Sequence, residues 1–193
     1  GVGVSGTIQP VQITNASNPA AVKSWLGVDA SELNFSLDFP PLTLAVTEGA
    51  LQLNSVTDVG AAKLDWATLT TPAAGTHNGL PFGLAIDDAL SLHVAGQASI
   101  EFAGLLTVQG GFQLDQLDVT DADLTAVVGS GATALALTLT ASASGGGVGV
   151  SGTLHLIQIT NASNPAAVKS WLGVDASDLN FSLDFPPLTL AVT

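Results

Sequence analysis

The chain has 193 residues and a formal net charge of −13, because 16 acidic residues stand against three lysines and no arginine. Binding to a nucleic acid backbone needs clustered basic side chains, so this composition excludes a nucleic-acid partner. Cysteine is absent. Its absence excludes disulfides, thiolate metal sites and cysteine nucleophiles, and it fits an extracellular protein that does not depend on redox conditions.

The chain contains one stretch of sequence twice. Residues 1–47 recur as residues 147–193, an offset of 146 positions, and 42 of the 47 residues are identical. Solenoid units have periods of roughly 20 to 50 residues, whereas a period near 146 is the size of a whole domain. We therefore divide the chain into one complete repeat, residues 1–146, and the first third of the next repeat, residues 147–193.

Residues 1–14 alternate apolar and polar side chains and predict a β-strand. Pro10 interrupts this run, and the matching residue of the second copy is Leu156. Proline has no backbone N–H to donate, so the position of Pro10 must be a sheet edge, a bulge or the start of a strand.

Residues 18–27 carry the signals of a short helix: an asparagine for the N-cap, Pro19 at the first helical position and a glycine just after the end. We expect about two turns here, and the same helix again at residues 164–173. Trp25 and Trp171 are the large apolar residues of these two segments. They are expected to anchor the helix on the core rather than to serve as exposed platforms for sugar rings.

Strand patterns continue through most of the first repeat. After the expected helix, Pro40-Pro41 and a turn at Glu48-Gly49 separate three predicted strands: residues 33–39, 42–47 and 50–56. Residues 58–83 lose the alternation and gather Pro, Gly and Asn, which predicts a long ordered loop with Trp66 as its anchor. Residues 89–120 then return to short alternating runs. We expect Gly96, Gly104 and Gly110-Gly111 to separate these runs.

A hairpin is predicted near the end of the first repeat. Its two strands are residues 123–128 and 133–144, and the turn is Gly129-Ser130-Gly131. Three leucines of the second strand share one face, which we expect to be a core face: Leu135, Leu137 and Leu139.

Three runs of the sequence resemble the repeats of giant secreted bacterial surface proteins. They are LQLNSVTDVGAAKLDWATL (residues 51–69), LSLHVAGQASIEFAGLLTVQGGFQL (residues 90–114) and LDVTDADLTAVVGSGATALALTLTASASG (residues 117–145). Those proteins are very large, acidic and free of cysteine, some carry an LEPR-XLL segment, and they are described as adhesin-like. The resemblance implies an extracellular or cell-surface array whose partners are adjacent repeats of the same chain or identical chains in a fibre, and it supplies no catalytic residue.

The best candidate for a binding site is a cluster of four acids in DQLDVTDADLT: Asp115, Asp118, Asp121 and Asp123. An Asp-rich turn between strands can supply several of the six to eight oxygen ligands that calcium takes. The spacing matches neither an EF-hand loop nor the calcium-binding nonapeptide repeat, so a solvated acidic turn is the competing interpretation. Calcium is the one cofactor that the sequence suggests.

No set of residues in the sequence indicates a catalytic reaction. The G-x-S-x-G elbow, the P-loop and the dinucleotide fingerprint are all missing from the sequence, so we expect the protein not to be an enzyme. Residues 124–168 carry no charged side chain, yet they alternate Leu with Ala and Thr and are broken by glycines, so we expect strands and no membrane insertion.

These observations predict an all-β fold with one short helix per repeat, arranged as a β-solenoid-like or stacked-sheet fibre. Head-to-tail β-sandwich domains are the alternative. The expected function is that of a structural repeat in an extracellular bacterial filament, stalk or adhesin shaft. The alternative is a ligand-binding module for glycans or for calcium-bridged surfaces.

Overall fold

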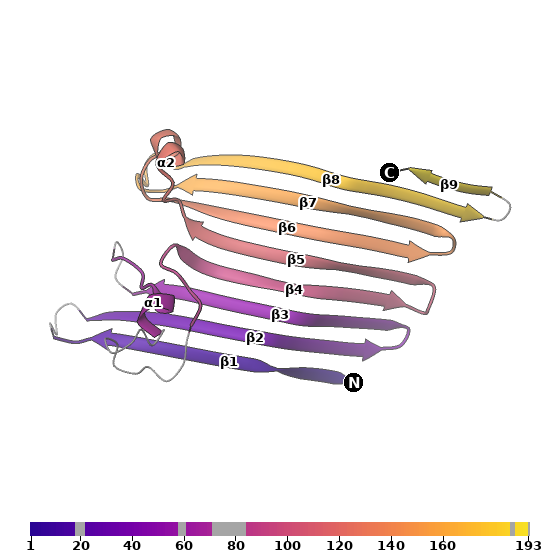
Figure 1. Cartoon of the computed structure of the whole chain (residues 1–193), viewed down its shortest axis with the longest axis horizontal. Helices are drawn as coiled ribbons and strands as arrows, with labels where there is room; N and C mark the ends of the chain where they lie inside the picture. The colour runs from indigo at the N-terminus through magenta and orange to yellow at the C-terminus, as the bar shows by residue number, and fades with distance from the viewer. Residues whose placement is uncertain (18–21, 58–60, 71–83, 186–187, 193) are drawn as a thin grey trace.

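The computed structural model describes residues 1–17, 22–57, 61–70, 84–185 and 188–192. These residues form one antiparallel sheet of nine strands, whose order in space is their order along the chain (Figure 1). The strands are β1 (Val2–Asn15), β2 (Lys23–Phe39), β3 (Leu42–Val56), β4 (Leu90–Phe102), β5 (Leu106–Asp118), β6 (Ala132–Gly145), β7 (Val148–Asn161), β8 (Lys169–Phe185) and β9 (Leu188–Val192). The helices are α1 (Trp66–Thr70) and α2 (Ala122–Val128). The all-β class predicted from the alternating sequence is confirmed, but the expectation of one short helix per repeat is wrong, because the described part of residues 1–146 holds both α1 and α2.

The sandwich alternative is not what the described residues form, because a sandwich needs two packed sheets and they make one. The leucines of β6 therefore do not face an interior as we expected. Leu135, Leu137 and Leu139 are all partly exposed, since a single layer leaves both sheet faces open over most of their area.

The helix expected at residues 18–27 is wrong where the structure describes it. Trp25 lies on β2 and pairs with Ile13 of β1 and with Val56 of β3. In the second copy, residues 162–168 form a turn and Trp171 lies on β8. A two-turn helix is too short to offset its nucleation cost, whereas a strand between two neighbours gains backbone hydrogen bonds on both sides. Residues 18–21 lie outside the described part.

Three other local expectations are corrected. Glu48-Gly49 is not a turn but a bulge inside β3, where Glu48 has a φ of 54°. Residues 123–128 are not a strand: they belong to α2, because the Asp121 side chain caps it by accepting from the backbone N–H groups of Asp123 and Leu124. The predicted strand after them is confirmed as β6.

The glycines of residues 89–120 do not divide short strands, apart from Gly104, which lies in the turn between β4 and β5. Gly96 and Gly110 lie inside strands of 13 residues each. At Gly110 the reason is a close backbone approach, because a Cβ there would lie only 1.8 Å from the carbonyl oxygen of Thr140 on β6.

The two copies of the duplicated sequence adopt the same pairing. In both, the first two strands pair in the same register, with one irregularity between Ser5 and Thr7 and again between Ser151 and Thr153. The strand β7 of the second copy also pairs along its length with β6. Because the sheet runs through this junction without a break, the division into repeats at residue 146 stays a prediction.

Pro10 lies on β1, which is the edge strand of this sheet, and this agrees with the constraint that we derived from its missing N–H. Its partner is Val28 of β2. The backbone oxygen of Ser24 faces β3, where it accepts from Thr57, so by alternation the backbone groups of Val28 face β3 as well. Pro10 therefore turns its nitrogen toward the open edge. Leu156 takes this position on the interior strand β7.

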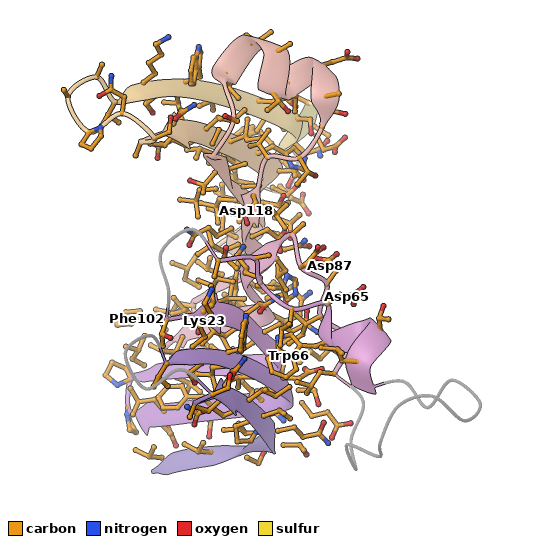
Figure 2. All side chains as sticks on the ribbon, turned by 90° about the vertical axis from the view of Figure 1, so that its left-hand side faces the viewer. Lys23, Asp65, Trp66, Asp87, Phe102 and Asp118 are labelled. Carbon is orange, nitrogen blue, oxygen red and sulfur yellow. The ribbon has the colours of Figure 1, made fainter. Side chains whose placement is uncertain are left out.

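One segment covers part of one sheet face. We call residues 61–70 and 84–89 the Trp66 segment. Its Trp66, Leu84 and Ile86 are buried and form a cluster with Val11 of β1 and Leu90 of β4. Figure 2 shows α1 on one side of the sheet, with Trp66 directed toward the strands. The prediction that Trp66 anchors this excursion is confirmed. Residues 66–70 of the expected loop are helical, and residues 58–60 and 71–83 lie outside the described part.

Candidate functional site

The two faces of the sheet carry different side chains. One face carries Gly27 and Asn54 and is covered in part by the Trp66 segment; we call it the Trp66 face. Side chains alternate along each strand, so Ala30 and Leu51 belong to the other face.

That other face carries a continuous row of aliphatic side chains, which we call the aliphatic row. Its eight members are cross-strand partners from β1 through β8: Ile8, Ala30, Leu51, Val94, Leu114, Leu137, Leu156 and Val174. Ile8 and Val174 at its two ends are 64% and 61% exposed, and the leucines between them are partly exposed. A row of this kind is an apolar surface on which a second sheet could pack.

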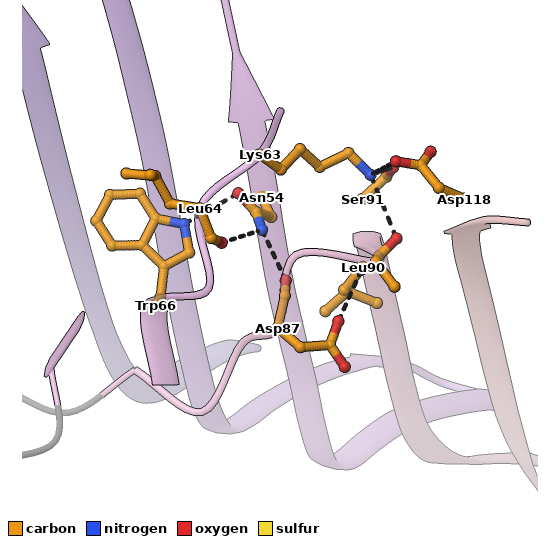
Figure 3. Close-up of polar contacts among 9 residues, drawn as sticks. Asn54, Lys63, Leu64, Trp66, Asp87, Leu90, Ser91 and Asp118 are labelled. Atoms are coloured by element: carbon orange, nitrogen blue, oxygen red, sulfur yellow. Dashed lines mark hydrogen bonds and ion pairs between the residues drawn. The ribbon is translucent and has the colours of Figure 1, made fainter. Parts of the chain in front are cut away.

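Asn54 holds the Trp66 segment to the sheet. Its side chain is 2% exposed, and its Oδ1 accepts a hydrogen bond of 2.9 Å from Trp66 Nε1 (Figure 3). Its Nδ2 donates to the carbonyl oxygens of Leu64 at 2.8 Å and Asp87 at 2.7 Å. We call residues 61–65, before α1, the first arm of the segment and residues 84–89, after α1, the second arm. The buried Asn54 amide thus joins the two arms, because it binds Leu64 in the first and Asp87 in the second.

Lys63 makes a second attachment. Its Nζ lies 2.8 Å from a carboxylate oxygen of Asp118, at the end of β5, and donates to Ser91 Oγ at 2.6 Å and to the Ala89 carbonyl oxygen at 3.3 Å (Figure 3). The ammonium group therefore ties the first arm of the segment to β4 and β5, away from Asn54.

The Trp66 ring packs directly over Gly27, and we call this position on the sheet the indole seat. A Cβ at Gly27 would lie 2.7 Å from Cε2 of Trp66 and 2.9 Å from Cδ1 of Leu84, so only glycine lets the indole approach the β2 backbone this closely. Trp25, two residues earlier on β2, packs partly buried against the same cluster, and its Nε1 donates to the Ala62 carbonyl oxygen at 3.1 Å. This contact fits the expectation of an anchor, although on a strand rather than on a helix.

Asp65 stands just before α1. Its carboxylate accepts hydrogen bonds from the hydroxyl and the backbone N–H of Thr68, which lower the pKa of Asp65. This is the geometry of a helix N-cap, and it orients the short helix that begins with Trp66.

The four acids of the expected calcium site have separate neighbours. His93 Nδ1 lies 2.5 Å from Asp115 Oδ1, and Gln113 donates to the other oxygen of Asp115 at 2.6 Å. Asp118 pairs with Lys63, and Asp121 caps α2, of which Asp123 is a first-turn residue. Within the described residues no group of three or more His, Asp or Glu side chains is placed to hold a metal ion.

Calcium binding by these acids stays a prediction, tested by thermal unfolding in millimolar calcium and in chelator. We expect at most a small rise of the midpoint with calcium, because Asp115, Asp118 and Asp121 already have protein partners that the ion would have to replace. A midpoint that does not change, with no metal bound at these residues, would leave a solvated acidic turn.

The sequence did not point to Asn161, the last residue of β7. Its Nδ2 donates to the carbonyl oxygens of Val128 at 2.8 Å and Ser130 at 3.3 Å, so it fixes the C-terminal end of α2. Its Oδ1 accepts from the backbone N–H of Ser163, as Asn15 in the first copy does from Ser17. The duplication does not single this asparagine out, because 42 of the 47 duplicated residues are repeated in the same way.

Among the described residues no helix is both long and apolar enough to cross a membrane. Comparison of the chain with protein-family models, with curated proteins and with solved structures finds no match in any of the three.

Proposed function

We propose that the chain is a structural repeat of an extracellular bacterial filament, stalk or adhesin shaft, in which copies of the 146-residue unit extend one sheet. The observation that carries the proposal is the pairing between β6 and β7. It runs from Ala132 opposite Asn161 to Gly145 opposite Val148 without a register shift. The first strand of the second copy thus joins the sheet in the same way as any other strand, with no linker between the copies.

The Asn161 contacts support the same idea. This asparagine belongs to the second copy, while the carbonyl oxygens that it binds, on Val128 and Ser130, belong to the residues before it. Asn15 is the same residue in the first copy, on the edge strand β1. Each copy therefore carries a donor suited to an α2 on the preceding side.

The strand geometry sets the dimensions of the proposed filament. Neighbouring strands are about 4.8 Å apart, so the six strands β1 to β6 of one repeat advance the sheet by about 29 Å. Strands of mostly 13 to 17 residues, at about 3.3 Å each, make a ribbon roughly 45 to 55 Å wide.

The aliphatic row supports stacking of such ribbons in pairs. Two sheets that pack face to face lie about 10 Å apart, and their inner side chains interdigitate. Leucine, valine or isoleucine side chains from seven of the eight strands would be removed from water together in this arrangement, whereas Ala30 of β2 is already buried. Burial of each such side chain is worth about 1.5 to 3 kcal/mol at most.

The test is electron microscopy of filaments assembled from chains with several repeats. We expect ribbons with an axial period of about 29 Å that associate in face-to-face pairs. The change Leu137→Lys places a charge in the aliphatic row, and we expect it to separate the pairs into single ribbons of unchanged period. The change Thr138→Lys is the matched control, because Thr138 is the next residue of β6 and lies on the Trp66 face.

Separate beads joined by flexible glycine segments, without an axial period near that value, would overturn the continuous sheet. If Thr138→Lys disrupted the pairing as strongly as Leu137→Lys, the aliphatic row would not be the contact and the stacking would have to be abandoned.

A further inference from the structure

The two copies of the duplicated sequence present the same surface, but only the first is covered. Val11 is 7% exposed beneath the Trp66 segment, whereas its counterpart Ile157 is 44% exposed. Gly27 is buried under the Trp66 ring, whereas Gly173 is exposed, and a Cβ there would meet only the Ile157 side chain at 3.1 Å. The seat for an indole is thus repeated on β8.

The adjoining edge of β8 is open over the same residues. In the first copy, Trp25 to Ala30 of β2 pair with Val56 to Leu51 of β3. In the second copy, β8 pairs with β9 only from Phe181 to Phe185. The backbone groups of residues 171–176 on that side therefore have no strand partner among the described residues.

We propose that the β7–β8 face at Ile157, Trp171 and Gly173, together with this edge of β8, is a docking site for a second copy of residues 48–90. The strand part of that segment, residues 48–56, adds to the β8 edge through main-chain hydrogen bonds. The Trp66 indole of the added segment then packs over Gly173. Asn54 of that segment accepts a hydrogen bond from Trp66 Nε1, as it does in the first copy.

The occupant follows from the site that is already filled. The strands beneath the Trp66 segment have the same register in both copies, so a segment that fits over Gly27 meets the same backbone over Gly173. The differences are small: Val11 is replaced by Ile157, and Gln9 is replaced by His155 at the border of the seat. A side chain other than glycine at residue 173 would close the seat, yet the sequence keeps glycine there.

This inference deepens the filament proposal and rests on it, because a sheet extended by a further copy would place that copy's residues 48–90 at this site. Its test needs one added segment, with neither an array nor stacked sheets. Failure of docking would leave the pairing of β6 with β7 intact, and failure of filament assembly would leave the docking measurable.

The experiment titrates the 193-residue chain with a fluorescently labelled peptide of residues 48–90. We expect saturable binding of one peptide per chain, followed by fluorescence anisotropy. A peptide with Trp66→Ala should bind at least tenfold more weakly. The chain variant Gly173→Ala should weaken binding at least tenfold, because its Cβ occupies the place of the indole, while its far-UV circular dichroism spectrum should keep the sheet signal of the unaltered chain.

Two outcomes would overturn the proposal. The first is no binding of the unaltered peptide up to high micromolar concentration. The second is binding that Gly173→Ala leaves unchanged, which would mean that the peptide displaces the chain's own segment over Gly27 or attaches elsewhere.

Discussion

Replacement of Trp66 by alanine is expected to lower the free energy of unfolding by about 3 to 5 kcal/mol. The indole is fully buried, and its loss opens a cavity between Leu84, Ile86 and the β2 backbone at Gly27. It also leaves Asn54 Oδ1 without its donor in a buried site. Urea unfolding followed by far-UV circular dichroism measures the change.

The matched control is Trp171→Ala, because Trp171 is a partly exposed tryptophan on β8. We expect it to cost about 1 to 2 kcal/mol, less than Trp66→Ala, because part of the Trp171 ring already contacts water and its loss encloses no buried polar group. Equal costs for the two changes would mean that Trp66 does not hold its segment on the sheet, and the covered face would need another explanation.

The strands could be predicted because their signal is local. Alternation in residues 1–14, 33–39 and 133–144 corresponds to β1, to part of β2 and to β6. The helix at residues 18–27 failed because its signals are local as well, whereas the competing strand partners lie 12 to 31 residues away in sequence at Ile13 and Val56. Pairing on both sides prevailed over capping preferences.

The site was predicted only in part. Trp66 stood out as a large apolar residue in a polar, glycine-rich stretch, so its role as an anchor could be foreseen. Asn54 looked like an ordinary polar residue of an alternating strand, because its burial depends on residues 64 and 87 returning over it. Likewise, nothing in the spacing of the acids indicated that His93 and Lys63 would be the neighbours of Asp115 and Asp118.

Replacement of Asn54 by leucine is expected to cost about 3 kcal/mol or more. The side chain keeps its approximate size, but Trp66 Nε1–H and the carbonyl oxygens of Leu64 and Asp87 lose their partner. Each buried polar group left in this state costs about 1 to 3 kcal/mol. The control is Gln52→Leu on the same face of β3, whose single bond to the Ala85 carbonyl oxygen is long at 3.5 Å, so its loss should cost below about 1 kcal/mol.

The change Asn54→Asp tests the same three contacts through their pH dependence. A carboxylate at this position can still accept from Trp66 Nε1, but its other oxygen would face the carbonyl oxygens of Leu64 and Asp87 with no proton between them. Burial and these oxygens favour the protonated acid, so the pKa of the new carboxyl should rise in the folded state above its unfolded value of about 3.9.

An acid whose folded pKa is raised binds more protons when folded, so the stability lost relative to the unaltered chain is smallest below about pH 4. The loss then grows as the pH rises toward the folded pKa and is constant above it. Urea midpoints of the variant and of the unaltered chain between about pH 3 and pH 8 measure this difference. A deficit that is the same at every pH would show that the carboxylate reaches water, and that the Trp66 segment does not close over residue 54.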